Sequence, residues 1–161
     1  MDIEHTKAIL VPTDFSPKGI AAMKHANIFA DKMKKKITLF HVIADYDQKT
    51  EALAKLREVA MANEAQSGVI TEYSTGTGTI FEQIGQAADI LNASFVVMGT
   101  HGIKGIQKIT GSYALKVISK SKKPYVVVQK EPPRSPYQNI LIPITHNPES
   151  KQALFHIMHI A

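Results

Sequence analysis

The chain has 161 residues, enough for one domain with a sizeable core, and its formal net charge is +5. It contains no cysteine, which excludes disulfides, thiol catalysis and cysteine-bound metals. The one dense basic run, residues 32–36, falls at the end of a predicted helix, so we expect no nucleic-acid partner. No apolar run approaches the roughly 20 residues of a membrane span. Residues 1–5 lack the apolar core of a signal peptide, so we expect a cytoplasmic protein without membrane contact.

Five runs of apolar and β-branched residues predict β-strands, because strands buried on both faces of a parallel sheet are apolar throughout. The predicted strands cover residues 8–12, 37–43, 68–74, 94–98 and 124–129. The third run is more polar than the others, so we place it near an edge of the sheet.

Between these strands, apolar residues recur at spacings of three and four, which predicts amphipathic helices. The predicted helices cover residues 17–34, 50–66, 80–92 and 112–121. Ser16 and Pro17 suit the N-cap and first residue of the first helix, and Thr79 with Glu82 predicts a capping box at the third. The alternation predicts an α/β fold, an open, doubly wound parallel five-stranded sheet with helices on both faces.

A second copy of the first strand follows this predicted domain. Residues 140–143, Ile-Leu-Ile-Pro, repeat residues 9–12, Ile-Leu-Val-Pro, and without a gap Pro148 then falls on Pro17. We therefore expect a domain at residues 1–131, a Pro-rich linker at 132–138, and the first strand and partial helix of a truncated second repeat at 139–161. The alternative is that two βα units look alike by chance.

The candidate binding site lies where the strand order of an open parallel sheet reverses, beyond the carboxyl ends of the strands. We expect the first and fourth strands to flank that point, which selects the loops at residues 12–16 and 99–112. The second loop holds four glycines and ends in Ser112 at a predicted helix start, where free N–H groups and the helix dipole attract phosphate. The alternative is a plain glycine-rich connection with Ser112 as the N-cap. We expect His41 to be a packed, hydrogen-bonded histidine, not a general base.

Three stretches of the chain resemble the universal stress protein family, and the resemblance extends over essentially the whole length. The stretches are residues 9–16 (Ile-Leu-Val-Pro-Thr-Asp-Phe-Ser), residues 39–42 (Leu-Phe-His-Val), and Met98-Gly99-Thr100-His101-Gly102 with Gly111-Ser112. ATP-binding members of that family carry a loop of the form G-x2-G-x9-G-[S/T]. The resemblance implies an adenine-nucleotide α-hydrolase-like fold with strand order 3-2-1-4-5. It also implies ATP or another adenine nucleotide in the cleft, with Mg²⁺ only if the nucleotide brings it.

The resemblance also implies roles for individual residues. Asp14, after Pro12, would meet the ribose, and the backbone of Val42 would hold the adenine. The remaining residues would line the pocket or hold the phosphates, and they are Met98, Gly99, His101, Gly102, Gly111, Ser112 and the backbone N–H of Tyr113. Family members commonly form homodimers through the last strand, here residues 124–129. We expect such a dimer, with exchange of the 139–161 tail as a further option.

The glycine loop departs from the family pattern in one respect. Eight residues, not nine, separate Gly102 from Gly111, and Ile103 stands where a basic residue is usual. The first hypothesis is a nucleotide-binding regulatory or stress-response module with at most weak ATP hydrolysis, since no general base faces the phosphates. The second is a nucleotide-free, dimeric interaction or scaffold protein. The third, an ATP-hydrolysing or nucleotidyl-transferring enzyme, lacks an identifiable catalytic group.

Overall fold

The computed structural model describes residues 7–100, 116–119, 121–133, 137 and 139–141. Its centre is a five-stranded sheet in the order β3-β2-β1-β4-β5, in which every neighbouring pair is parallel. The strands are β1 (Ile9–Pro12), β2 (Ile37–Ile43), β3 (Thr71–Thr77), β4 (Phe95–Gly99) and β5 (Tyr125–Val128). This confirms the α/β fold, the strand order and the edge position of the third strand.

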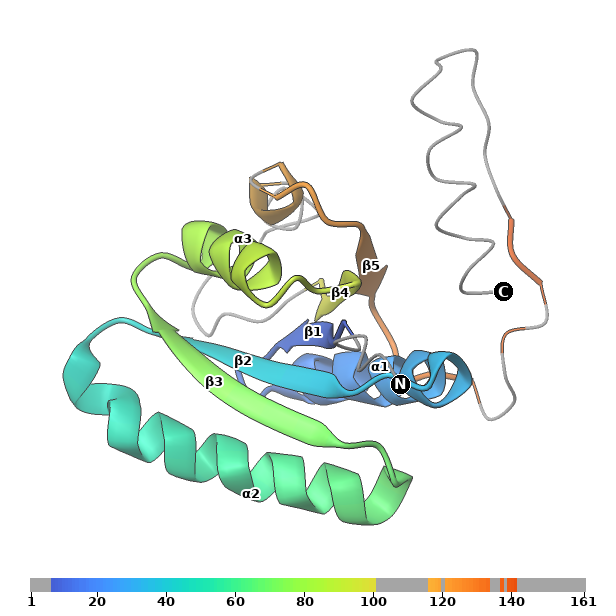
Figure 1. Ribbon diagram of the computed structural model, residues 1–161, viewed down its shortest axis with the longest axis horizontal. Helices are drawn as coiled ribbons and strands as arrows, with labels where there is room; N and C mark the ends of the chain where they lie inside the picture. The colour runs from blue at the N-terminus through green and yellow to red at the C-terminus, as the bar shows by residue number, and fades with distance from the viewer. Residues whose placement is uncertain (1–6, 101–115, 120, 134–136, 138, 142–161) are drawn as a thin grey trace, which may run out of the picture.

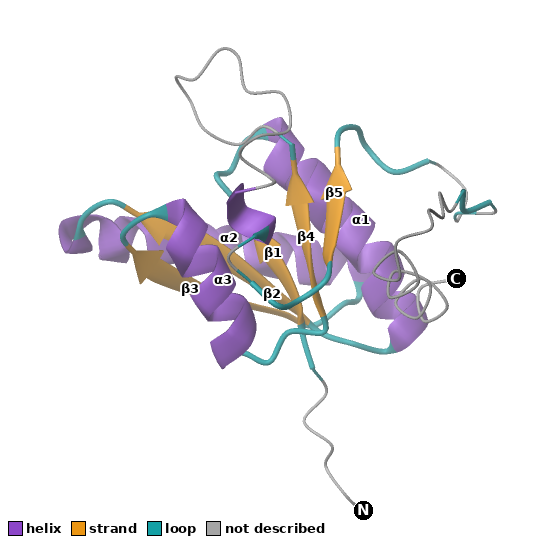
Figure 2. Cartoon of the chain, turned by 90° about the horizontal axis from the view of Figure 1, so that it is seen from above, coloured by secondary structure: helices purple, strands orange, loops and turns teal. Residues whose placement is uncertain are grey.

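Helices cover both faces of the sheet, as predicted (Figures 1 and 2). The elements are α1 (Pro17–Met33), α2 (Lys49–Ser67), α3 (Ile80–Ile90) and a short 3₁₀ turn, η1 (Tyr46–Gln48). Figure 1 shows α2 on one side of the sheet and α3 on the other. None of the helices in the described part of the chain is both long enough and apolar enough to cross a membrane.

Each face of the sheet buries its own hydrophobic cluster. The cluster under α1 and α2 includes Ile9, Val11, Phe29, Ile37, Leu39, Leu56, Phe95 and Val97. The cluster under α3 includes Leu10, Phe40, Ile84, Ala88, Val96 and Val117. Successive residues of β1 therefore point to opposite clusters, which is why this strand reads as continuously apolar.

Apart from shifts of one or two residues at the ends of other elements, two details differ from the sequence predictions. The third strand begins at Thr71, not at residue 68, because Gly68 adopts φ 72° as the C-cap of α2. Thr79 is the N-cap residue of α3, but its hydroxyl oxygen lies 3.1 Å from the Glu82 carboxylate and caps no backbone N–H. The predicted capping box is therefore wrong, although the predicted start of the helix is right.

Candidate functional site

The turn after β1 presents Asp14 at the carboxyl edge of the sheet. The Asp14 Oδ1 atom accepts a hydrogen bond from the Ser16 N–H (3.0 Å), and the Ser16 hydroxyl oxygen accepts from the Gly19 N–H (3.2 Å) as the N-cap of α1. Phe15, between them, adopts φ 63°, which is uncommon for a bulky side chain and is held by the surrounding turn. The carboxylate is thus fixed through one oxygen. Its other oxygen, Oδ2, has no partner among the described residues.

Val42 offers a backbone donor and acceptor beside this turn. The Thr13 N–H donates to the Phe40 carbonyl oxygen (2.9 Å), so the backbone groups of Phe40 face β1. The backbone N–H and C=O groups of successive strand residues point to opposite sides, so the groups of Val42, two residues after Phe40, also face the side of β1. The strand β1 ends at Pro12, opposite Phe40, so no strand of the described chain lies across from Val42 on that side.

Gly99 brings the end of β4 against the first turn of α1. A Cβ atom at this position would lie 2.9 Å from the carbonyl oxygen of Lys18, closer than real Cβ contacts. Only glycine therefore allows this approach of the two backbones. On the sheet, Gly99 pairs with Val128, and the Thr100 N–H donates to the Val128 carbonyl oxygen (3.0 Å).

The structure thus brings the first half of the predicted site together. Pro12 ends β1 and Asp14 lies in the turn after it, Val42 lies near the end of β2, and Met98 and Gly99 end β4. These are three adjacent strands of one sheet, and the order reverses between β1 and β4. Val42 and Met98 both pack partly against the cluster under α3.

The second half of the predicted site, which would hold the phosphates, lies outside the described residues. It consists of His101, Gly102, Gly111, Ser112 and Tyr113. Their roles remain predictions from the resemblance. Among the residues that the structure does describe, no group of three or more histidine, aspartate or glutamate side chains is placed to hold a metal ion.

A pocket of about 220 Å³ opens on the α2 side of the same edge, and sequence analysis did not predict it. It is lined by Phe15, His41, Ile43, Gln48, Glu51, Ala52 and Lys55. The Phe15 ring packs against His41, with 4.7 Å between ring centroids, and the Lys55 ammonium lies 4.4 Å from the Phe15 centroid. Lys55 is 40 residues from Phe15 in sequence, so no local pattern could have revealed this contact.

His41 is a hydrogen-bonded histidine, as predicted. Its Nδ1 atom lies 2.7 Å from the carbonyl oxygen of Thr13, and the side chain is half-buried. A carbonyl oxygen only accepts, so we assign the proton to Nδ1. The bond ties β2 to the turn that carries Asp14, which gives His41 a positioning role.

Comparison with known proteins identifies relatives over most of the chain. A model of the universal stress protein family matches residues 5–129. Universal stress protein MJ0577 of Methanocaldococcus jannaschii is 27% identical over an alignment of 155 residues, and the match spans 78% of this chain and 96% of that protein. The solved structure of MJ0577 aligns with a TM-score of 0.58 at 30% identity, over 80% of this chain and 99% of that one.

Two further solved structures share the fold. Universal stress protein UspA from Lactobacillus plantarum aligns with a TM-score of 0.67 at 18% identity, over 77% of this chain and 98% of that one. A universal stress protein from Archaeoglobus fulgidus, solved in complex with dAMP, aligns with a TM-score of 0.62 at 21% identity, over 76% of this chain and 98% of that one.

Proposed function

The chain belongs to the universal stress protein family, and we propose that it is a stress-response module that binds an adenine nucleotide at the carboxyl edge of its sheet. The observation that carries this proposal is the backbone N–H and C=O pair of Val42, which faces the space beyond the end of β1. The dAMP complex of a family member with the same fold supports the choice of ligand class.

The Val42 pair is complementary to the edge of adenine. Adenine presents an acceptor, N1, next to a donor, its exocyclic amino group. The N–H of Val42 would donate to N1, and its C=O would accept from the amino group, as two neighbouring hydrogen bonds. Oδ2 of Asp14 would then accept from a ribose hydroxyl. In this pose Gly99 would stand at the entry to the phosphate loop.

The rest of the ligand would be held by the second half of the site. We propose that Gly102, Gly111, Ser112 and the N–H of Tyr113 cradle the phosphates, with His101 beside them. Mg²⁺ would arrive only with the nucleotide, because Asp14 is the single acid we assign to the site. With no general base assigned, binding and not turnover is the proposed activity.

Base selectivity tests this function. Guanine presents a donor, N1–H, and an acceptor, O6, at the positions where adenine presents an acceptor and a donor. The Val42 N–H donor would then face the N1–H donor of guanine, and the Val42 C=O acceptor would face O6, another acceptor. We therefore expect GTP to bind at least about 10-fold more weakly than ATP. Isothermal titration calorimetry with ATP, ADP, AMP and GTP measures this. Failure of all three adenine nucleotides to bind at millimolar concentration would contradict the proposal.

The alternative that we keep is a nucleotide-free interaction module, for which the shortened glycine loop is the supporting observation. It would act through a homodimer, and the outer edge of β5, where Val127 is partly exposed, offers a surface for strand pairing. Nucleotide released from the purified, denatured protein and identified by mass spectrometry would exclude this alternative.

We also propose the two-repeat organisation, with a domain at residues 1–131, a linker at 132–138 and a second repeat that opens at 139. The family match ends at residue 129, close to the proposed boundary, and the repeated Ile-Leu-Ile-Pro of residues 140–143 supports it. Most of the proposed second repeat, residues 142–161, lies outside the described residues.

A further inference from the structure

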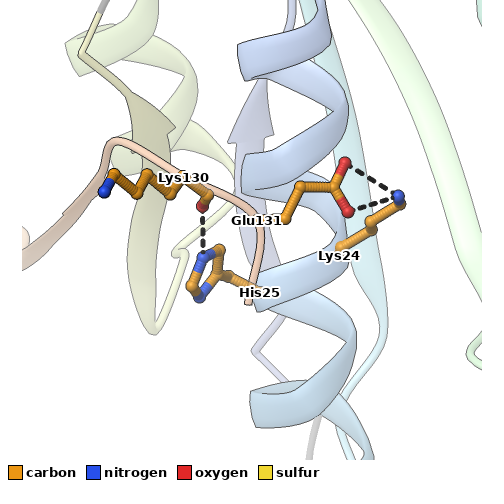
Figure 3. A network of polar contacts seen from close by, with 4 residues as sticks. All are labelled: Lys24, His25, Lys130 and Glu131. Carbon is orange, nitrogen blue, oxygen red and sulfur yellow. Dashed lines mark hydrogen bonds and ion pairs between the residues drawn. The ribbon is translucent and has the colours of Figure 1, made fainter. Parts of the chain in front are cut away.

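The chain that leaves β5 is bound along α1 (Figure 3). The Lys24 ammonium lies 2.9 and 2.6 Å from the two carboxylate oxygens of Glu131, and Nε2 of His25 lies 2.8 Å from the carbonyl oxygen of Lys130. Further on, the Tyr137 hydroxyl contacts Nδ1 of His25. We call Lys130, Glu131 and Tyr137 the strap, and we call Lys24, His25 and Phe29 its seat on α1.

Aromatic packing completes the seat. The Tyr137 ring stacks on Phe29, with 5.8 Å between centroids and 8° between planes, and on His25, with 5.9 Å and 20°. Phe29 is itself a member of the cluster between α1 and the sheet. Tyr137 therefore packs on two side chains that are themselves buried in the domain, His25 and Phe29.

The strap satisfies both nitrogens of His25, which is 6% exposed. The Lys130 carbonyl oxygen only accepts, so we assign the ring proton to Nε2. Nδ1 is then an acceptor, and the Tyr137 hydroxyl is its donor. A tyrosine hydroxyl keeps its proton near neutral pH, and partial burial raises the pKa of Tyr137 further.

The same segment reaches the candidate nucleotide site. Lys130 lies two residues beyond Val128, the last residue of β5. The Val128 carbonyl oxygen accepts from the Thr100 N–H (3.0 Å), and Val128 pairs with Gly99. Gly99 in turn lies against the backbone of Lys18 in α1. The strap, the end of β5 and the end of β4 are thus linked by successive contacts, and both the strap and the end of β4 contact α1.

We propose that the strap is a regulatory contact, which sets the position of Gly99 and Thr100 according to whether the strap is docked on α1. The seat is occupied by the end of this domain, at Lys130 and Glu131, and by Tyr137 of the proposed linker, so docking or release of these residues would act on the ends of β4 and β5. The consequence for nucleotide affinity rests on the proposed function, because Gly99 opens the proposed phosphate loop.

Two sets of variants of the full chain test the strap. Tyr137→Ala removes the stack and the hydrogen bond to His25, and the side chain is exposed enough that the fold should tolerate the change. Glu131→Lys breaks the ion pair, and Lys24→Glu with Glu131→Lys restores it with reversed charges. Hydrogen exchange by mass spectrometry is followed in peptides that cover residues 95–100 and 129–131, and ATP affinity is measured by calorimetry.

We expect Tyr137→Ala to speed exchange in both peptides by roughly 10-fold and to weaken ATP binding by at least about 5-fold. Glu131→Lys should change exchange and ATP affinity in the same direction by about 2- to 5-fold, since exposed ion pairs are weak. The double variant should return both quantities toward the wild-type values. Unchanged exchange at residues 129–131 in Tyr137→Ala would overturn the docking, and unchanged exchange at residues 95–100 would overturn the coupling.

The nucleotide measurement separates the two proposals. Faster exchange in both peptides with unchanged ATP affinity would overturn the regulatory role and leave the proposed function standing. If the wild-type protein binds no adenine nucleotide, the proposed function fails. Exchange at Gly99 and Thr100 then still decides whether the strap controls the end of β4.

Discussion

Replacing Gly99 by alanine is expected to lower the free energy of unfolding by about 1–3 kcal/mol and to weaken adenine-nucleotide binding. The added Cβ atom would lie 2.9 Å from the Lys18 carbonyl oxygen and 3.2 Å from its carbonyl carbon. These are backbone atoms in the first turn of α1, so neither can rotate away. The end of β4 or the start of α1 must shift, and both border the candidate site.

Gly68→Ala is the matched control for this variant. Gly68 also requires glycine, but for its φ of 72°, and nothing lies within 4 Å of an added Cβ atom. The Gly68→Ala protein should lose roughly 1 kcal/mol of stability through backbone strain. Its place at the far end of α2 should leave nucleotide affinity unchanged. Urea unfolding measures the stability of both variants, and calorimetry measures their nucleotide affinity. A Gly99→Ala protein as stable as the wild type would contradict the close approach of β4 and α1.

Asp14→Ala is expected to weaken ATP binding by about 10- to 100-fold, the range for losing a hydrogen bond to a charged group. The substitution removes Oδ2, which we assign to the ribose, and also Oδ1, which accepts from the Ser16 N–H. Asp14→Asn keeps an oxygen for Ser16 and should retain the turn, so its loss of affinity should be smaller. Equilibrium dialysis with ATP gives the ratios.

Asp31→Asn serves as the control for a lost carboxylate, because Asp31 is an exposed residue at the end of α1 that pairs only with Lys34 among the described residues. It should bind ATP as the wild type does. Wild-type affinity in Asp14→Ala would remove Asp14 from the site and with it our placement of the ribose.

Most of the fold could be predicted from sequence because each signal was local. Strands buried on both faces are apolar throughout, as in Ile9–Val11, and Ser16-Pro17 marks the start of α1 with its own cap. The third strand was misplaced by three residues because Gly68 reads equally well as part of a polar strand or as a helix cap. Its φ, and therefore its role, depends on where α2 ends.

The candidate site was predicted only in part. Family resemblance pointed to Asp14, Val42 and Gly99, and the topology then placed them at the ends of adjacent strands. Two further contacts, one in the strap and one beside the Asp14 turn, join residues far apart in sequence. Tyr137 and His25 are 112 positions apart, and His41 and Thr13 are 28 apart. Neither contact has a local pattern, so both could only be found in the folded chain.

The backbone amide of Val42 provides the most direct test of the nucleotide site. In ¹⁵N-labelled protein titrated with AMP, the account predicts that the Val42 amide resonance shifts and its hydrogen exchange slows, because its N–H comes to donate to adenine N1. The Gly68 amide, which donates to the Glu64 carbonyl oxygen (2.9 Å) away from the site, should not change. Saturable AMP binding that leaves the Val42 amide unmoved would contradict the proposed adenine site.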